Sequence, residues 1–179
     1  MPADPFVVHV ARLRRVPGTR WHEVREGPFD PEGVLRPSSD ADSAVPAGAS
    51  ARSDVVLEAF DGGVMVTGTV VAPWEGLCRR CAVAVGGELV VPVRERFVSE
   101  PSSGEPEDDE AYPMVDDDLD LGPMVRDTII MALPLAPLCR ATCQGLCPYC
   151  GADRNEEPCR CVAPRDLRWA NLDVLRSTP

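Results

Sequence analysis

The chain has 179 residues, 44% of them hydrophobic, which is enough to bury a core in one domain or one domain with a small appendage. Its net charge of −11 argues against a strong electrostatic grip on nucleic acid, although ten acids and no cation lie in residues 99–120, so that the rest is near neutral. There is no run of 18 apolar residues and no secretory signal, so we expect a cytoplasmic protein without a membrane partner.

Residues 1–35 are expected to form N-terminal strands. The apolar run in "FVVHVARL" (6–13) predicts one strand, and a second is expected around Trp21 to Val24, after a Pro-Gly turn. Residues 36–53 are rich in Ser, Ala, Pro and Asp and cannot bury enough apolar surface to order themselves. They are interpreted as a flexible linker.

The strongest strand pattern lies in residues 54–98, which we interpret as a β-hairpin core. Apolar residues alternate on both sides of Asp61-Gly62-Gly63, which predicts a first hairpin. A second hairpin is expected around Gly86-Gly87. The sequence "CRRC" would then lie where the two hairpins join.

The remaining chain divides into three segments. Residues 99–118 are interpreted as an acidic disordered loop, and residues 119–138 as a helix segment that ends before Pro134. Residues 139–179 combine a Cys-rich metal-binding loop with a short terminal helix. The expected fold class is α+β: a small antiparallel β-sheet or barrel core of two hairpins, one packed helix, a C-terminal loop held by zinc, and the terminal helix.

The eight cysteines carry the clearest chemical signal. Cys147-Pro-Tyr-Cys150-Gly is a knuckle in which two thiols can point at one ion, and Cys78-x2-Cys81 has the same spacing. Thiolates favour zinc, or iron in a cluster. The spacing does not decide which four cysteines share an ion, but two sites of four ligands would use every thiol. The candidate ligands are Cys78, Cys81, Cys139, Cys143, Cys147, Cys150, Cys159 and Cys161.

Three other uses of the cysteines compete with metal binding. Disulfides suit a secreted protein, and no export signal is present. A redox dithiol at Cys78 and Cys81 is conceivable because the two intervening arginines would lower a thiolate pKa, but the pair sits between expected strands rather than at a helix start. The Cys143-x3-Cys147-x2-Cys150 spacing resembles that of radical-SAM enzymes, whose large barrel cannot be built from the 29 residues after Cys150.

Other catalytic signals are weak, so we expect no enzyme and no small-molecule substrate. The two histidines, His9 and His22, lie near the N-terminus in expected strands. No Gly-rich phosphate loop follows a strand, and no serine nucleophile elbow is present.

The order of these features resembles the YceD family, described as large ribosomal RNA subunit accumulation proteins. "DGGVMVTGTV" leads into "CRRC"; after the acidic stretch, "DLDLGPMVRDTIIMALPLAPLC" leads into "GLCPYCGADRNEEPCRC" and "PRDLRWANLDVL", so the resemblance covers roughly residues 54–175. One departure is Arg154, where the family often has Leu. The family pattern is matched at Cys78, Arg80, Cys81, Leu121, Val125, Asp127, Ile129, Pro134, Gly145 to Gly151, Asn155, Cys159 and Cys161.

The resemblance implies a non-enzymatic bacterial factor that supports 23S ribosomal RNA accumulation or processing by binding that RNA or a large-subunit precursor. Candidate RNA-binding residues are Arg79, Arg80, Arg94, Arg96, Arg140, Arg154 and Arg160. Two alternatives remain open. The chain could be a zinc-stabilised protein-interaction module whose acidic segment docks a basic ribosomal protein, or a thiol oxidoreductase at Cys78 and Cys81.

Overall fold

The computed structural model describes residues 4–28, 43–99, 111–157, 159–162 and 168. Their largest structural unit is a six-stranded sheet of order β2-β4-β5-β6-β7, in which β3 pairs separately with β5. In the described part of the chain this sheet stays open, so the barrel alternative is not realised. The strands are β2 (Arg20–Pro28), β3 (Ser43–Ala44), β4 (Ser50–Phe60), β5 (Gly63–Leu77), β6 (Ala84–Ser99) and β7 (Tyr112–Met114).

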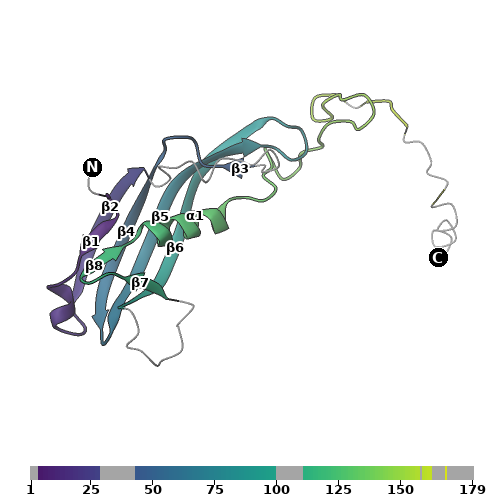
Figure 1. Cartoon of the computed structure of the whole chain (residues 1–179). Helices are drawn as coiled ribbons and strands as arrows, with labels where there is room; N and C mark the ends of the chain where they lie inside the picture. The colour runs from purple at the N-terminus through teal and green to yellow at the C-terminus, as the bar shows by residue number, and fades with distance from the viewer. Residues whose placement is uncertain (1–3, 29–42, 100–110, 158, 163–167, 169–179) are drawn as a thin grey trace.

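A second layer covers one face of this sheet (Figure 1). It consists of the short antiparallel pair β1 (Val7–His9) and β8 (Asp118–Asp120), the 3-10 turn η1 (Leu13–Arg15), and the helix α1 (Gly122–Ala132). A sheet core with one packed helix is therefore present, and the α+β prediction is confirmed at this level. No helix among the described residues is long and apolar enough to cross a membrane.

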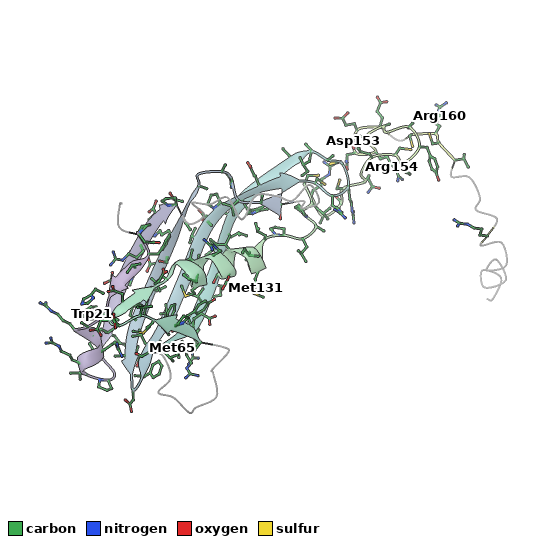
Figure 2. All side chains as sticks on the ribbon, in the orientation of Figure 1. Trp21, Met65, Met131, Asp153, Arg154 and Arg160 are labelled. Atoms are coloured by element: carbon green, nitrogen blue, oxygen red, sulfur yellow. The ribbon has the colours of Figure 1, made fainter. Side chains whose placement is uncertain are left out.

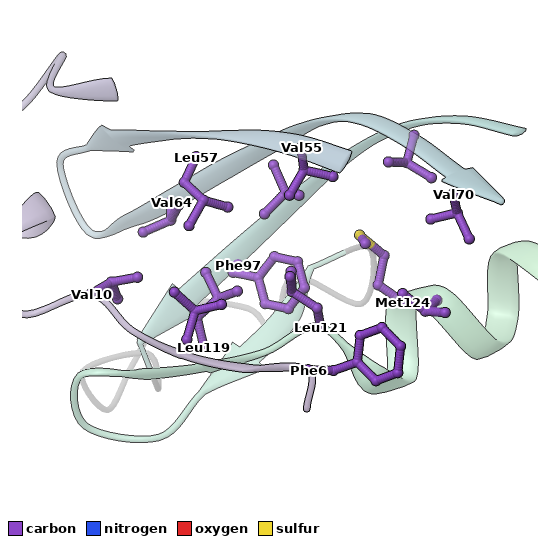
Figure 3. Packing of buried hydrophobic residues seen from close by; sticks show 14 of the residues in the cluster. Phe6, Val10, Val55, Leu57, Val64, Val70, Phe97, Leu119, Leu121 and Met124 are labelled. Atoms are coloured by element: carbon purple, nitrogen blue, oxygen red, sulfur yellow. The ribbon is translucent and has the colours of Figure 1, made fainter. Parts of the chain in front are cut away.

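The hydrophobic core lies between the two layers (Figure 3). Every second residue of β4 and β5 points inward, as the period of a strand requires, and small or branched aliphatic side chains fill these positions. Because aromatic residues make up only 5% of the chain, Val, Leu and Ile supply most of the buried area. The sheet contributes Val55, Leu57, Val64, Val70 and Phe97, and the second layer contributes Phe6, Val10, Leu119, Leu121 and Met124.

The opposite face of the sheet faces solvent. The residues on this face alternate along each strand with the core residues, and many of them are charged. The register of the strands brings opposite charges on neighbouring strands close together. Arg20 on β2 forms an ion pair with Glu58 on β4 at 2.9 Å, and His22 hydrogen bonds to Asp54 at 2.6 Å. Several aliphatic side chains here are also exposed, with Val90 at 62%.

The prediction of two hairpins is wrong in its second half. Gly86 and Gly87 form no turn but lie inside β6, which pairs with β5 along its whole length, from Leu77 opposite Ala84 to Gly63 opposite Val98. The glycines serve close packing instead: a Cβ on Gly86 would lie 2.8 Å from the Trp74 carbonyl oxygen, and one on Gly87 would lie 3.3 Å from the Trp74 indole nitrogen. Three long strands therefore form a meander, and "CRRC" lies in the β5–β6 loop.

The linker predicted over residues 36–53 also differs from the structure where it is described. Ser43–Ala44 form β3, and β4 already begins at Ser50. Ala51 and Ser53 are fully buried and alternate with exposed Ser50 and Arg52, as in a strand. The pattern is hidden in the sequence because the buried residues are small and are also common in linkers. Residues 36–42 lie outside the described residues.

The acidic loop predicted over residues 99–118 is ordered at its C-terminal end, while residues 100–110 lie outside the described residues. Tyr112 in β7 stacks on Phe97 with ring centroids 5.1 Å apart, and its hydroxyl donates a hydrogen bond to Asp127 of α1 at 2.9 Å. Arg14 holds the following turn by donating to the Asp116 carbonyl at 2.8 Å and to the Asp117 carboxylate at 3.0 Å. These specific contacts outweigh the disorder that the acidic composition predicts.

Other elements follow their sequence signals. The α1 helix begins at the predicted Gly-Pro and ends at Ala132, before Pro134. The first strand is shorter than its apolar run, because η1 follows β1 within residues 6–15. The predicted terminal helix falls almost wholly outside the described residues, since only Arg168 is described after Val162.

We expect Gly68→Ala to destabilise the sheet by about 1–3 kcal/mol, the usual cost of overpacking a well-packed site. Gly68 lies in the central strand β5, where an added Cβ would collide with the Asp54 carbonyl oxygen and lie 2.7 Å from the Val55 Cα. The free energy of unfolding in denaturant measures this effect. Thr67→Ala, at an exposed position of the same strand, is the control; equal stability of the two variants would contradict the prediction.

Candidate metal centre

The structure gathers the eight cysteines into two clusters of four. The proximal cluster contains Cys78, Cys81, Cys139 and Cys143, and the distal cluster contains Cys147, Cys150, Cys159 and Cys161. Within each cluster all four sulfur atoms lie within 4.8 Å of one another, and all eight cysteines are free. The spacing in the sequence did not decide which four cysteines share a site, and the structure does: each cysteine belongs to one of two groups of four.

Two distant segments build the proximal cluster. The β5–β6 loop supplies Cys78 and Cys81, and the segment after α1 supplies the other pair. The loop closes through hydrogen bonds from Cys78 N to Val83 O and from Ala82 N to Cys78 O, both 2.8 Å, with Ala82 at a φ of 57°. Arg79 N donates to Pro137 O at 2.8 Å, which fixes the second segment against the loop.

The sulfur atom of Cys78 is placed to carry a negative charge. Burial opposes ionisation, but the backbone amides of Cys139, Arg80 and Cys81 donate hydrogen bonds to this sulfur and lower the pKa of Cys78 to about 6. Amides of the second and third following residues aimed at the first sulfur are the hallmark of a knuckle. The predicted lowering of this pKa is therefore found, but backbone amides cause it, whereas the prediction attributed it to the arginine side chains.

The distal cluster repeats this knuckle at Cys147. Gly151, at a φ of 73°, lets its amide donate to the Cys147 carbonyl at 2.9 Å, and Cys147 N donates to Ala152 O at 2.8 Å. The amides of Cys150 and Tyr149 donate to the Cys147 sulfur and lower its pKa to about 6. Gly151, the residue after the second cysteine, therefore supplies the left-handed backbone conformation that this tight turn requires.

Each cluster also contains a thiol that resists ionisation. Burial, followed by the hydrogen bond to Cys143, raises the pKa of Cys139 to about 12. The hydrogen bond to Cys150, followed by burial, raises the pKa of Cys161 to about 12. Four sulfurs this close cannot all hold negative charge unless a cation is placed among them.

The geometry fits a tetrahedral metal ion. Metal–sulfur bonds of about 2.3 Å place the sulfurs of a tetrathiolate site roughly 3.8 Å apart. The Cys78–Cys143 and Cys81–Cys139 sulfur pairs are separated by 3.8 Å and 3.6 Å. The residues present therefore suit a four-coordinate ion bound entirely by protein, with no position left open for a substrate.

The two clusters differ in burial. In the proximal cluster Cys78 and Cys143 are buried and Cys139 is exposed, whereas in the distal cluster only Cys147 is buried. Figure 2 shows why: the distal loop, marked by Asp153, Arg154 and Arg160, lies beyond the end of the sheet. No cysteine of either cluster belongs to the main hydrophobic core.

The seven predicted RNA-binding arginines fall into two separate groups. Arg94 and Arg96 lie on the solvent face of β6, the latter with its guanidinium 5.8 Å from the Phe60 ring centroid. The other five surround the cysteine clusters. Arg94 and Arg96 lie about 33 Å and about 40 Å along the strand from Ala84, so the groups cannot form one small patch.

One arginine of the second group has a structural role. Arg80 donates from Nη1 to the Cys143 carbonyl at 2.7 Å, and its own carbonyl accepts from Leu146 N at 2.9 Å. Gly145 packs directly on it, since a Cβ there would lie 2.8 Å from the Arg80 carbonyl oxygen, and its φ is 70°. Arg80 thus ties the β5–β6 loop to the segment between the clusters.

Sequence reasoning named every cysteine but missed Asn155 as a site residue. The Asn155 side-chain amide donates to the Cys143 sulfur at 3.5 Å, and its oxygen accepts from Gln144 N at 2.7 Å. Asn155 belongs to the family pattern quoted above, so a signal existed. Spacing could not show that it contacts the proximal cluster, because it lies in the loop that carries the distal one.

A family model described as "Large ribosomal RNA subunit accumulation protein YceD" matches residues 66–176. The chain belongs to the YceD family. The matched region includes both cysteine clusters, the β5–β6 strand pair that presents the first, and α1.

Curated relatives match most of the chain. Uncharacterized proteins of Mycobacterium tuberculosis and Mycobacterium bovis are each 36% identical over 172 residues, covering 95% of this chain and 81% of the relative. One of Mycobacterium leprae is 36% identical over 131 residues, covering 72% of this chain and 60% of the relative. No solved structure matches this YceD-family chain.

Removal of metal by a chelator is expected to loosen both segments of the proximal cluster while the sheet stays folded. The core that holds β4 and β5 together contains no cysteine, so it does not depend on the ions. Hydrogen exchange measures this: amides of residues 78–83 and 139–157 should exchange faster after chelation, and those of residues 55–66 should not. Faster exchange in residues 55–66 would show that the core itself depends on metal.

Metal affinity is expected to rise with pH. Near pH 7 Cys78 and Cys147, with pKa values of about 6, are mostly thiolates, whereas Cys139 and Cys161, with pKa values of about 12, keep their protons. An ion must displace those protons, so binding releases protons, and below about pH 6 it must displace more of them. Competition with a chelator across this range measures the effect; a pH-independent affinity would contradict it.

Proposed function

We propose that this protein is a non-enzymatic cytoplasmic factor that supports accumulation of large-subunit ribosomal RNA by binding 23S RNA or a precursor particle. The observation that carries the proposal is membership of a family described by this role, through a match that includes both clusters. The cluster geometry agrees with a non-enzymatic role, because four protein ligands leave a bound ion no open position for chemistry.

Zinc is the ion we assign to both clusters. Four thiolates in a tetrahedral arrangement suit zinc, which has no redox chemistry and commonly holds small loops in this way. The need for such support is clear here: residues 139–157 contain no helix or strand of their own, only an isolated bridge between Leu146 and Asp153. The ions would supply the stability that this segment does not obtain from an apolar core.

The cysteine loops carry no net positive charge, so we place the candidate RNA contacts on the arginines of the sheet. Residues 139–162 contain three arginines and three acids, a formal sum of zero before the thiolates are counted. A zinc ion with four thiolates adds a formal −2, so the loops are not cationic. On the solvent face of the sheet, Arg94 and Arg96 lie two residues apart on β6. On the same face, Arg20 pairs with Glu58 and Arg52 pairs with Asp54.

The double variant Arg94→Ala/Arg96→Ala is expected to weaken binding to 23S RNA or to large-subunit precursors. For every phosphate that the protein no longer neutralises, the log–log slope of affinity against salt concentration should become shallower by about 0.7–0.9. Affinity measured at several salt concentrations tests this, and Arg20→Ala, which removes an arginine of β2 from the same face, is the control. Capture of neither 23S RNA nor large-subunit particles by the unaltered protein would contradict the proposed function.

The negative charge supports a second candidate, a zinc-stabilised module that docks a basic ribosomal protein. Residues 100–110 alone carry six acids and no cation. Replacing Glu105, Glu107, Asp108, Asp109 and Glu110 by their amides keeps the chain length and leaves β7 untouched. Loss of a basic protein from the captured complex favours this candidate, while tighter RNA binding favours the first.

A thiol oxidoreductase at Cys78 and Cys81 is the least supported candidate. Both cysteines share a cluster with Cys139 and Cys143, where a bound ion would protect their sulfurs. Alkylation of the native protein followed by mass measurement separates the two ideas: modification of both thiols with metal retained elsewhere would favour redox chemistry.

A further inference from the structure

We propose that the two metal sites are coupled, because Asn155, held by the distal loop, completes the environment of the proximal site. The inference rests on the proposed binding of an ion in each cluster and adds a residue that links them. Its basis is a contact between a residue of one loop and a ligand of the other site. The Asn155 Nδ2 atom lies 3.5 Å from the Cys143 sulfur, although Asn155 stands between Cys150 and Cys159 in the chain.

The side chain of Asn155 is fixed on both of its polar atoms. Its oxygen accepts a hydrogen bond from Gln144 N at 2.7 Å, and Nδ2 also donates to the Asp153 carboxylate at 2.6 Å. The same carboxylate accepts from Asn155 N at 2.8 Å. The amide therefore points at Cys143 as the outcome of a closed set of bonds and not as one of several side-chain orientations.

These bonds exist only if the distal loop is folded back. The bridge between Leu146 and Asp153 and the bond from Arg154 N to Gly145 O, at 3.0 Å, close the loop next to the distal knuckle. The chain then continues to Cys159 and Cys161, whose sulfurs return to the same knuckle. Binding of an ion by Cys147, Cys150, Cys159 and Cys161 thus fixes both ends of the segment that carries Asn155.

The junction between the sites is short and rigid. Only Gln144, Gly145 and Leu146 separate Cys143 of the proximal site from Cys147 of the distal site. Arg80 holds this junction from the other side, by accepting a bond from Leu146 N and donating one to the Cys143 carbonyl. Ordering of the distal loop is therefore transmitted to Cys143 rather than absorbed by flexible chain.

A hydrogen bond donated to a ligand sulfur stabilises its negative charge and fixes its orientation. Loss of such a partner around a metal site typically costs about 10- to 100-fold in metal affinity. An empty distal site would leave Asn155 without its fixed position, so the proximal ion should bind more weakly. Since coupling between binding equilibria is reciprocal, loss of the proximal ion should weaken the distal ion by the same factor.

The test is a mutant cycle on the full-length protein, with zinc affinity measured by chelator competition and the bound ions counted by native mass spectrometry. Cys159→Ser/Cys161→Ser removes two distal ligands and leaves only the proximal site. Asn155→Ala removes the proposed link while keeping all eight cysteines. We expect each change to weaken proximal binding by about 10- to 100-fold, and the combined variant to be no weaker than Asn155→Ala alone.

The control is Gln144→Ala. It removes a neighbouring side-chain amide but keeps the backbone N–H that donates a hydrogen bond to the Asn155 side-chain oxygen. It should leave both affinities unchanged. If Asn155→Ala weakens only the distal site, Asn155 merely shapes its own loop and the inference is wrong. Two ions in the unaltered chain, together with an unaltered proximal affinity in Cys159→Ser/Cys161→Ser, overturn the coupling alone. An unaltered chain that holds fewer than two ions overturns the metal proposal with it.

Discussion

Four cysteine sulfurs held within 4.8 Å of one another repel as thiolates, and the arrangement of this protein beyond its sheet depends on how that repulsion is relieved. The protein itself relieves it only in part. Backbone amides stabilise one charge per knuckle, on Cys78 and on Cys147, while Cys139 and Cys161 have pKa values raised to about 12. A divalent cation among the sulfurs would remove the remaining conflict, so the proposed ion would stabilise the folded shape of residues 139–157.

The sheet and the cysteine loops therefore follow different rules of stability. The sheet buries aliphatic side chains against Phe6, Leu119 and α1, and it needs no ion (Figures 1 and 3). The loops bury almost no apolar surface, and exposed Tyr149 and Val162 show that they form no second core. The continuous pairing of β5 with β6 connects the two parts, because it carries the first knuckle to the end of the sheet and holds it there. The glycines opposite Trp74 allow this pairing to continue where a hairpin was expected.

Where the sequence predicted structure correctly, a local rule decided the outcome. The Gly-Pro start of α1, the Gly62 turn and the x2 spacing of the two knuckles all depend on nearby residues, and each is found in the structure. The errors arose where tertiary contacts outweighed local composition. Gly86 and Gly87 look like a turn until Trp74 packs over them, and Ser50 to Ser53 look like a linker until they pair with β2. Likewise, the partition of eight cysteines into two sets depends on the path of the chain after α1, which no spacing encodes.

The residues between the clusters show why composition is a poor guide to the function of an individual arginine. Seven arginines were candidates for RNA contact on charge alone. The Arg80 guanidinium, however, donates to the Cys143 carbonyl, and Arg94 and Arg96 lie about 33–40 Å along the strand from the first knuckle. With three arginines and three acids in residues 139–162, a cysteine loop that held zinc through thiolates would not be a cationic surface. Under the proposed function, Arg94 and Arg96 on the uncovered face of the sheet are therefore the candidate phosphate contacts. The cysteine loops, with their rigid junction at Gly145 and their exposed Tyr149, are better suited to recognition by shape.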